Sequence, residues 1–178
     1  MLFTETPLAG SFLIAPERHG DNRGFFARTF CEMEFAERGL VVDWKQANAA
    51  YSAAVGVTRG MHYQRDPYGE TKLVRCTRGR VYDVIVDMRP GSATLHQWYG
   101  AELSHSNGVQ LYVPAGFAHG YQVIEADSEV AYMVSAFYTP EAECGIRWDD
   151  PAVGIDWPIR AEVAVSDKDR QWPLLQGR

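Results

Sequence analysis

The stretch Arg59-Gly60-Met61-His62-Tyr63-Gln64 decides how this chain is interpreted. Together with Lys72 it places an arginine, a histidine and a lysine within residues 59–72, which otherwise resemble two short strands. A second stretch, GVQLYVPAGFAHG at residues 108–120, ends with His119 just after a turn that contains Pro and Gly. We predict that the two stretches face each other across a small β-barrel. The rest of the chain would then build this barrel, fill it or close its mouth.

Strand-like runs make up most of the remaining sequence. Short apolar and aromatic runs are separated by Gly, Pro, Asn and Asp with almost no helix between them, which is typical of an antiparallel sandwich or barrel. The predicted strands span residues 11–14, 25–30, 41–51, 57–64, 71–76, 80–87, 95–104, 109–113, 119–125 and 129–138. The sequence therefore predicts an all-β fold.

The other segments complete this picture. Residues 16–24 (PERHGDNRG) have the composition of a turn-rich loop, and residues 32–38 form the one convincing helix, which ends at Gly39. The C-terminal part contains SDKDRQWP at residues 166–173 and is expected to be an ordered loop or short helix. We expect one domain over residues 1–178.

Composition excludes several classes of partner. The chain has 178 residues and a formal net charge of −6, which argues against a nucleic acid or an anionic membrane as the main partner but not against an anionic small molecule. Its three cysteines form neither a Cys-x-x-Cys pattern nor a disulfide framework. The first residues lack the pattern of a signal peptide, and no run is long enough to span a membrane, so we expect a cytoplasmic protein.

His62 and Lys72 together suggest proton abstraction next to a ketone. A neutral imidazole is a general base near neutral pH, and an ammonium stabilises an oxyanion as it develops. Tyr132 could return the proton from the opposite side, and Asp169 could orient His62, as carboxylates commonly do for histidine. These steps amount to an epimerisation without a redox cofactor. Taken singly, each of these residues is more often structural than catalytic, so the hypothesis depends on their occurring together.

The same residues argue against a metal. The segment Gly108-x5-Pro114-x-Gly116-x2-His119 matches the second motif of the cupin superfamily, and residues 60–79 look like a degenerate first motif. Metal cupins usually supply His-x-His and a glutamate from the first motif, whereas this chain has His62-x-Gln64 with Lys72 nearby. Two imidazoles beside a cation make a poor divalent site, so we expect no metal and no other cofactor.

Taken together, these motifs resemble the dTDP-4-dehydrorhamnose 3,5-epimerases, non-metal cupins of nucleotide-sugar metabolism, over nearly the whole chain. The fold implied is a cupin jelly-roll barrel. The landmarks, in the family's order, are GDNRGFF at residues 20–26, RGMHYQ at 59–64, KLVRC at 72–76, DVIVD at 83–87, PAGFAHG at 114–120, DDP at 149–151, IDWP at 155–158 and SDKD at 166–169.

The resemblance implies a role for each catalytic candidate. His62 would be the base, paired with Asp169, and Tyr132 the acid on the opposite face. Lys72 would stabilise the enolate oxygen at carbon 4 of the sugar, and His119 would line the sugar pocket.

It also implies a binding site for a nucleotide diphosphate. Arg59 and Lys168 would hold the diphosphate, a role that suits their charge. The remaining residues would stack on the nucleotide, line the site or, in the last two cases, reach it from a neighbouring subunit of a homodimer. They are Tyr138, Gln46, Asn48, Arg23 and Phe26.

One geometric requirement follows. In an ideal strand Arg59 and His62 point to opposite faces, so a bulge or twist must intervene if both are to touch one ligand.

Some positions depart from the family pattern and leave alternatives open. Arg28 stands where the family's DxRGxFxE has glutamate, Ala49 and Ala50 replace the usual His-Ser, Met61 replaces leucine, and one residue is inserted before Arg59. The nucleotide base, and inversion at one carbon or at both, therefore stay open. Alternatives from other classes are a metal-dependent cupin oxygenase or isomerase and a non-catalytic sugar-nucleotide binder.

Overall fold

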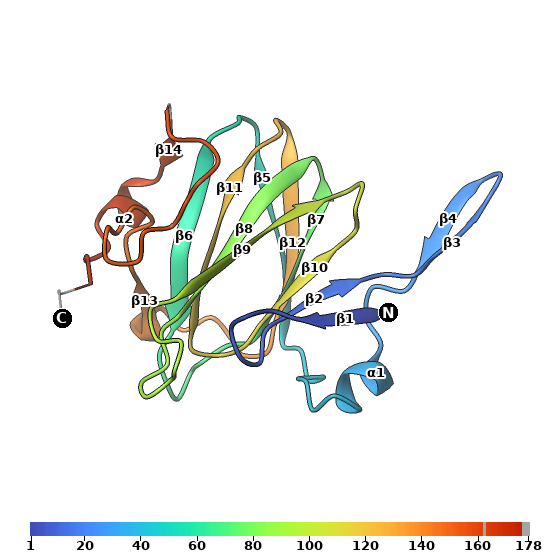
Figure 1. Ribbon diagram of the computed structural model, residues 1–178, viewed down its shortest axis with the longest axis horizontal. Helices are drawn as coiled ribbons and strands as arrows, with labels where there is room; N and C mark the ends of the chain where they lie inside the picture. The colour runs from blue at the N-terminus through green and yellow to red at the C-terminus, as the bar shows by residue number, and fades with distance from the viewer. Residues whose placement is uncertain (162, 176–178) are drawn as a thin grey trace.

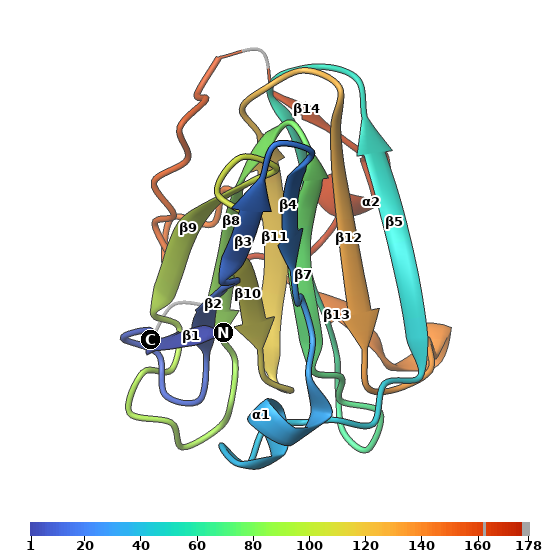
Figure 2. The same ribbon diagram turned by 90° about the vertical axis from the view of Figure 1, so that its right-hand side faces the viewer.

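The computed structural model describes residues 1–161 and 163–175. Its strands form two facing six-stranded sheets and a separate hairpin (Figures 1 and 2). The first sheet has the order β1-β2-β10-β7-β12-β5, and the second runs β13-β6-β11-β8-β9, with β14 paired to β6. All of these pairings are antiparallel except that of β14 with β6. The all-β prediction and its sandwich arrangement are therefore confirmed.

The elements have the following bounds: β1 Leu2–Glu5, β2 Phe12–Ala15, β3 Arg18–Asp21, β4 Gly24–Ala27, α1 Glu32–Ala36, β5 Gln46–Ser52, β6 Val57–Gln64, β7 Lys72–Arg78, β8 Arg80–Asp87, β9 Trp98–Ser104, β10 Gln110–Val113, β11 Phe117–Val123, β12 Ser128–Val134, the 3-10 helix η1 Pro140–Ala142, β13 Glu143–Gly145, β14 Ala164–Val165 and α2 Asp167–Arg170.

Three apolar clusters explain why the central strands β7, β8, β10 and β11 are buried on both faces. The cluster between the sheets includes Val74, Ile85 and Leu111. On the outer side of the second sheet, residues of the segment after β13 cover Val84 and its neighbours. The helix α1 and nearby aromatic residues cover the outer side of the first sheet.

Several predicted bounds were wrong. The strands expected at residues 25–30, 41–51 and 95–104 are shorter and correspond to β4, β5 and β9, and helix α1 ends at Ala36 rather than at residue 38. Residues 16–24 are not a loop, because they contain β3 and begin the β3–β4 hairpin, which projects from the body (Figure 1). All four residues of β3 are exposed, so the alternation that reveals a half-buried strand is absent. The edge strand β1 was missed, and β12 ends at Val134 rather than at residue 138.

The bulge that the sequence required lies between β6 and β11. His119 is paired with His62, and Tyr121 is paired with Arg59, so two residues of β6, Gly60 and Met61, oppose the single residue Gly120 of β11. Gly60 has a φ of +110°, and a Cβ there would lie 2.6 Å from the Gly120 Cα. The two glycines permit this close approach, and the extra residue turns both Arg59 and His62 toward the space between the sheets.

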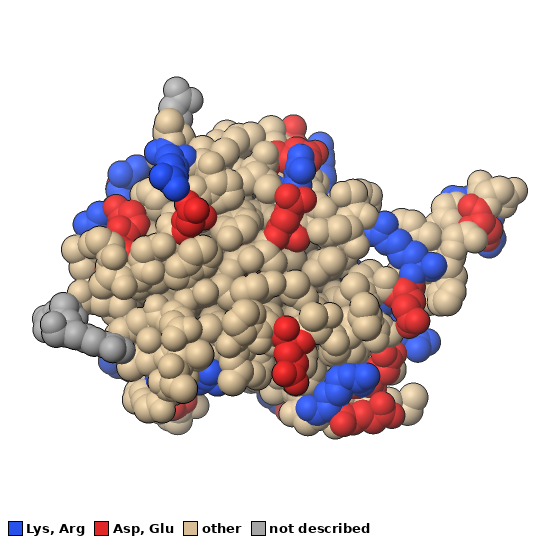
Figure 3. All heavy atoms as spheres, in the orientation of Figure 1, with Lys and Arg blue, Asp and Glu red and all other residues tan. Residues whose placement is uncertain are grey.

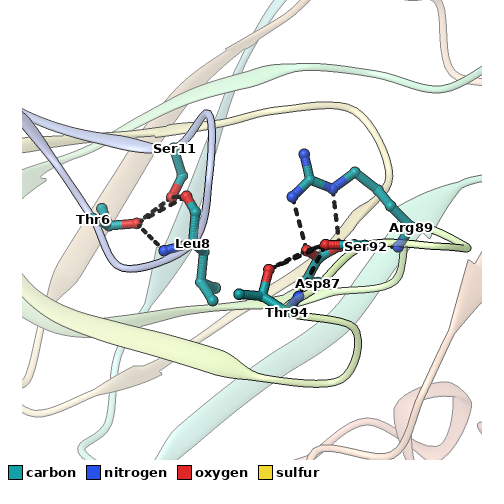
Figure 4. Close-up of polar contacts among 7 residues, drawn as sticks. All are labelled: Thr6, Leu8, Ser11, Asp87, Arg89, Ser92 and Thr94. Atoms are coloured by element: carbon teal, nitrogen blue, oxygen red, sulfur yellow. Dashed lines mark hydrogen bonds and ion pairs between the residues drawn. The ribbon is translucent and has the colours of Figure 1, made fainter.

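A buried carboxylate closes the loop between β8 and β9. Asp87 accepts hydrogen bonds from the Arg89 guanidinium at 2.9 and 2.8 Å, from the Ser92 hydroxyl at 2.6 Å and from the Thr94 hydroxyl at 2.7 Å (Figure 4). Burial would raise the pKa of Asp87, but these donors together hold it well below its usual range. The carboxylate therefore stabilises the fold only while it is ionised.

On the face shown in Figure 3, acidic and basic side chains are interspersed around the rim and do not gather by sign.

Among the described residues, no helix is long and apolar enough to cross a membrane.

Replacing Gly120 with alanine tests the close approach of β6 and β11. The new Cβ would lie 2.5 Å from the Arg59 carbonyl oxygen and 2.7 Å from the Met61 sulfur. We expect Gly120→Ala to lower the free energy of unfolding by about 2 kcal/mol, because overpacking forces backbone shifts. Denaturant unfolding measures this loss. Gly20→Ala is the control, since its Cβ would have no neighbour nearer than 3.5 Å, and equal losses in both variants would contradict the account.

Asp87→Asn tests the ionised carboxylate. Near pH 7 we expect a loss of about 2–3 kcal/mol, because the amide keeps the shape but not the charge. A depressed pKa stabilises the fold above the unfolded value of about 3.9, and this contribution disappears as the pH falls through the folded value. The difference between wild type and variant should therefore shrink below about pH 4 in unfolding experiments.

Asp149→Asn is the matched control. Arg147 forms the same bidentate pair with Asp149, but at a site where both side chains are more than one-third exposed. Water competes for that pair, so its loss should be much smaller. A pH-independent difference for Asp87→Asn would contradict the linkage.

Candidate active site

A cavity of about 510 Å³ lies between the two sheets, next to β14 and α2. A second cavity of about 350 Å³ adjoins it and shares His62, Lys72 and Tyr132. The predicted site residues that line one cavity or the other are Gln46, Asn48, Arg59, His62, Lys72, His119, Tyr132, Tyr138, Lys168 and Asp169. The structure thus gathers residues from β5, β6, β7, β11, β12 and α2 into one continuous site.

The His62 imidazole is held by Asp169. Its Nε2 lies 2.5 Å from Asp169 Oδ1, and the other carboxylate oxygen accepts the Gly60 backbone N–H at 3.2 Å. Ser166 caps α2 by accepting the Asp169 N–H at 3.1 Å, which fixes the start of this short helix. The contact that the sequence suggested is therefore present. Because Nε2 contacts Asp169, Nδ1 is the ring nitrogen of His62 that remains available to another partner.

The environment of Asp169 keeps it ionised. Burial would raise its pKa, but the hydrogen bond and charge of His62, the Gly60 N–H and Ser166 lower the pKa below its usual value. The Trp172 ring packs edge-on against His62, with centroids 6.1 Å apart. The imidazole is thus fixed by a carboxylate on one side and an indole on another.

A second histidine–carboxylate pair lies beside the first. His119 Nε2 is 2.9 Å from Asp83 Oδ1, and both side chains are buried. His119 is the cross-strand partner of His62, so the two imidazoles project from neighbouring strands of one sheet into the same cavity. The prediction that their two stretches face each other across the barrel was therefore wrong.

Tyr132 comes from the facing sheet. It lies on β12, whereas His62 lies on β6, so the phenol and the imidazole enter the cavity from opposite sides. Burial raises the pKa of Tyr132, the Glu70 carboxylate raises it further, and Arg59 acts in the opposite direction. The phenol therefore stays protonated well above neutral pH and can act as an acid.

Lys72 begins β7 and is 8% exposed. Its Nζ lies 3.1 Å from the Glu70 Oε1. Glu70 was not singled out in the sequence, although it precedes Lys72 by two residues and an extended chain places such residues on one side.

The mouth of the site carries a polar cluster. Lys168 Nζ donates to both Glu143 carboxylate oxygens, at 2.6 and 2.7 Å, and the Tyr138 hydroxyl donates to Glu143 at 2.8 Å. Glu143 and Trp172 were also missed in the sequence. The pairing of β13 with β6 and the fold of the C-terminal segment bring them close to the cavity, and no local sequence pattern predicts either.

Tyr138 reaches the site by a route other than the predicted one. Because β12 ends at Val134, Tyr138 does not share a strand face with Tyr132. Instead it follows in a loop, where its N–H donates to the Gln46 side chain at 2.8 Å. Both tyrosines still line the smaller cavity.

The nucleotide candidates near the N-terminus lie elsewhere in this chain. Arg23 and Phe26 line a separate depression on the β3–β4 hairpin, and Arg28 follows β4. The hairpin points away from β14 and α2, which flank the cavity (Figure 1). One chain alone therefore does not bring these three residues to the site. Within residues 1–161 and 163–175, no three His, Cys, Asp or Glu side chains are grouped to hold a metal ion.

Known proteins share both the sequence and the fold. Residues 5–177 match the family model described as dTDP-4-dehydrorhamnose 3,5-epimerase. The enzyme of that name from Sinorhizobium fredii is 46% identical over 98% of this chain and 90% of its own length.

Two solved structures agree with this match. The dTDP-4-dehydrorhamnose 3,5-epimerase from Elizabethkingia anophelis superposes with a TM-score of 0.95 at 39% identity and covers 98% of this chain and 96% of its own. The Legionella pneumophila dTDP-6-deoxy-D-glucose-3,5-epimerase, solved with dTDP-4-keto-L-rhamnose, gives 0.92 at 39% identity and covers 97% and 92%. The chain belongs to the dTDP-4-dehydrorhamnose 3,5-epimerase family of isomerases.

Proposed function

We propose that this protein epimerises a dTDP-4-keto-6-deoxyhexose of the dTDP-4-keto-6-deoxyglucose type, at carbons 3 and 5. The observation that carries the proposal is the opposition of two groups across one cavity. A carboxylate-held histidine enters from one sheet, a protonated tyrosine enters from the other, and Lys72 lies beside them. Inversion of a carbon needs a base and an acid on opposite faces, and this arrangement supplies both.

The proposed reaction starts at His62. Its Nδ1 takes the proton from a carbon next to the ketone, and the electrons of the C–H bond move onto the carbon-4 oxygen to form an enolate. The Lys72 ammonium stabilises that oxyanion. Tyr132 then gives its hydroxyl proton to the opposite face of the same carbon. His62 afterwards releases its proton to solvent, and the Tyr132 phenolate takes a proton from solvent.

The same residues can serve both carbons. In the chair of a gluco-configured sugar, the hydrogens on carbons 3 and 5 are both axial and lie on the same face. Each of these carbons is adjacent to carbon 4, so either carbanion delocalises onto the same oxygen. One base on one side, one acid on the other and one cation at the shared oxygen are therefore sufficient for two inversions.

The binding residues surround this centre. Arg59 is exposed at the cavity edge and suits the diphosphate, and Lys168 can join it by exchanging its Glu143 partner for phosphate. His119 lines the sugar pocket, and Tyr138, Gln46 and Asn48 line the adjoining cavity where the nucleoside would lie.

The site also needs a second copy of the chain. The hairpin carries an exposed Phe26 and Arg23 away from their own cavity, so they complete a nucleotide site only in a neighbouring subunit. We therefore propose a homodimer with shared active sites. Arg28 follows β4 and stands where the family pattern has glutamate, so the preference for the thymine base is a separate question from the reaction.

The first test is proton NMR of dTDP-4-keto-6-deoxyglucose with the enzyme in deuterium oxide. We expect deuterium to enter carbons 3 and 5. His62→Ala should slow both exchanges at least about 100-fold, because general bases contribute that much or more. The same spectra show which carbons exchange.

His105→Ala is the control, since this exposed histidine lies on a loop outside both cavities. Exchange at one carbon alone would limit the reaction to one centre. Binding of the sugar nucleotide without any exchange in the wild-type protein would overturn the proposal in favour of a non-catalytic binder.

A complementation experiment tests the shared site. Homodimers of His62→Ala and of the double variant Arg23→Ala/Phe26→Ala should each be nearly inactive. Mixed dimers should regain activity, because one of their two sites then combines an intact His62 with an intact hairpin. If the hairpin variant alone keeps wild-type activity and KM, or if mixing restores nothing, the shared site is wrong.

A further inference from the structure

Glu70 is a charged group inside the site that the proposed reaction does not use. It lines the adjoining cavity together with His62, Lys72 and Tyr132. The Glu70 and Lys72 side chains are only 13% and 10% exposed, and the closest oxygen and nitrogen are 3.1 Å apart. Water screens such a pair far less than a surface pair, so its charge acts on whatever lies beside it.

The backbone holds Glu70 firmly in this place. The next residue, Thr71, donates its N–H to the Ser135 hydroxyl at 2.9 Å and accepts the Ser135 N–H at 3.0 Å. Lys72 is then the cross-strand partner of Val134. Glu70 is thus fixed at the junction of β7 and β12, the two strands that carry Lys72 and Tyr132.

We propose that Glu70 is a positioning residue of the reaction, which holds the Lys72 ammonium at the carbon-4 oxygen and balances the positive charge of Lys72 and Arg59 beside the Tyr132 phenol. This inference rests on the function proposed above. An ammonium has three N–H donors, so a bond to Glu70 fixes the Nζ and leaves donors for the developing enolate. A fixed donor needs no reorganisation when charge forms, which is the condition for transition-state stabilisation.

The second part concerns the charge around Tyr132. Glu70 and Arg59 act on this phenol in opposite directions, with Glu70 opposing its ionisation. The other titratable or charged side chains that line the two cavities with it are His62 and Tyr63 of β6, Lys72 of β7, His119 and Tyr121 of β11, Tyr138, Glu143 of β13, and Lys168 and Asp169 of α2. Without Glu70, the cations Arg59 and Lys72 would face the phenol with one less nearby anion.

Glu70→Gln separates charge from shape. We expect kcat to fall about tenfold with little change in KM, because the lost charge matters most when the enolate forms. The alkaline limb of kcat should move to lower pH. Glu70→Asp keeps the charge, so its alkaline limb should stay near that of the wild type. Glu102→Gln removes the same charge from an exposed ion pair of β9 and should change neither quantity.

A readout without turnover separates this inference from the proposed function. The ultraviolet tyrosinate band of Tyr132, obtained as the difference between each protein and its Tyr132→Phe counterpart, should titrate at lower pH in Glu70→Gln than in wild type. Wild-type exchange into the sugar with an unchanged Glu70→Gln profile and titration would overturn the inference alone. Absence of wild-type exchange would overturn the proposed function, and with it this role of Glu70.

Discussion

The site depends on one constraint, the close approach of β6 and β11 at Gly60 and Gly120. Without the extra residue of β6 at this point, Arg59 and His62 would project from opposite faces of the sheet. The bulge brings both into the cavity, while Met61 between them packs into the apolar cluster on the outer side. The bulge also places the Gly60 N–H where Asp169 accepts it. Because Asp169 also contacts His62, the bulge and the orientation of the His62 imidazole are coupled.

Charges in the cavity are arranged as pairs. Asp169 holds His62, Asp83 holds His119, and Glu70 holds Lys72. A buried charge without a partner is strongly unfavourable, and each of these carboxylates lies against a nitrogen-bearing side chain. In the proposed reaction, Asp169 leaves one imidazole nitrogen of His62 free and Glu70 fixes the Lys72 ammonium, while the Tyr132 phenol enters from the sheet opposite His62. The proposal of a catalytic site therefore rests on where these charges lie and not on how many there are.

Sequence patterns predicted the centre of this molecule better than its periphery. The bounds of β6 and β8 agree with the predicted 57–64 and 80–87, because apolar runs between turn residues define buried strands. The need for a bulge followed from requiring Arg59 and His62 on one ligand. Strand β3 was missed because all four of its residues are exposed, although a strand was predicted over most of β4. Glu143 and Trp172 were missed because long-range pairing and the fold of the C-terminal segment bring them to the site. Arg23 and Phe26 lie on the hairpin, away from the cavity of their own chain, and this separation could not be predicted from local sequence patterns.

In the proposed reaction, base, acid and cation surround one sugar from three fixed directions. A crystal structure of the Tyr132→Phe variant with dTDP-4-keto-6-deoxyglucose tests this most directly. We predict His62 Nδ1 facing carbons 3 and 5 on one side of the ring, the side chain at position 132 on the other side, and Lys72 Nζ at hydrogen-bond distance from the carbon-4 oxygen. A sugar whose ketone points away from Lys72, or whose axial hydrogens face position 132 and not His62, would contradict the account.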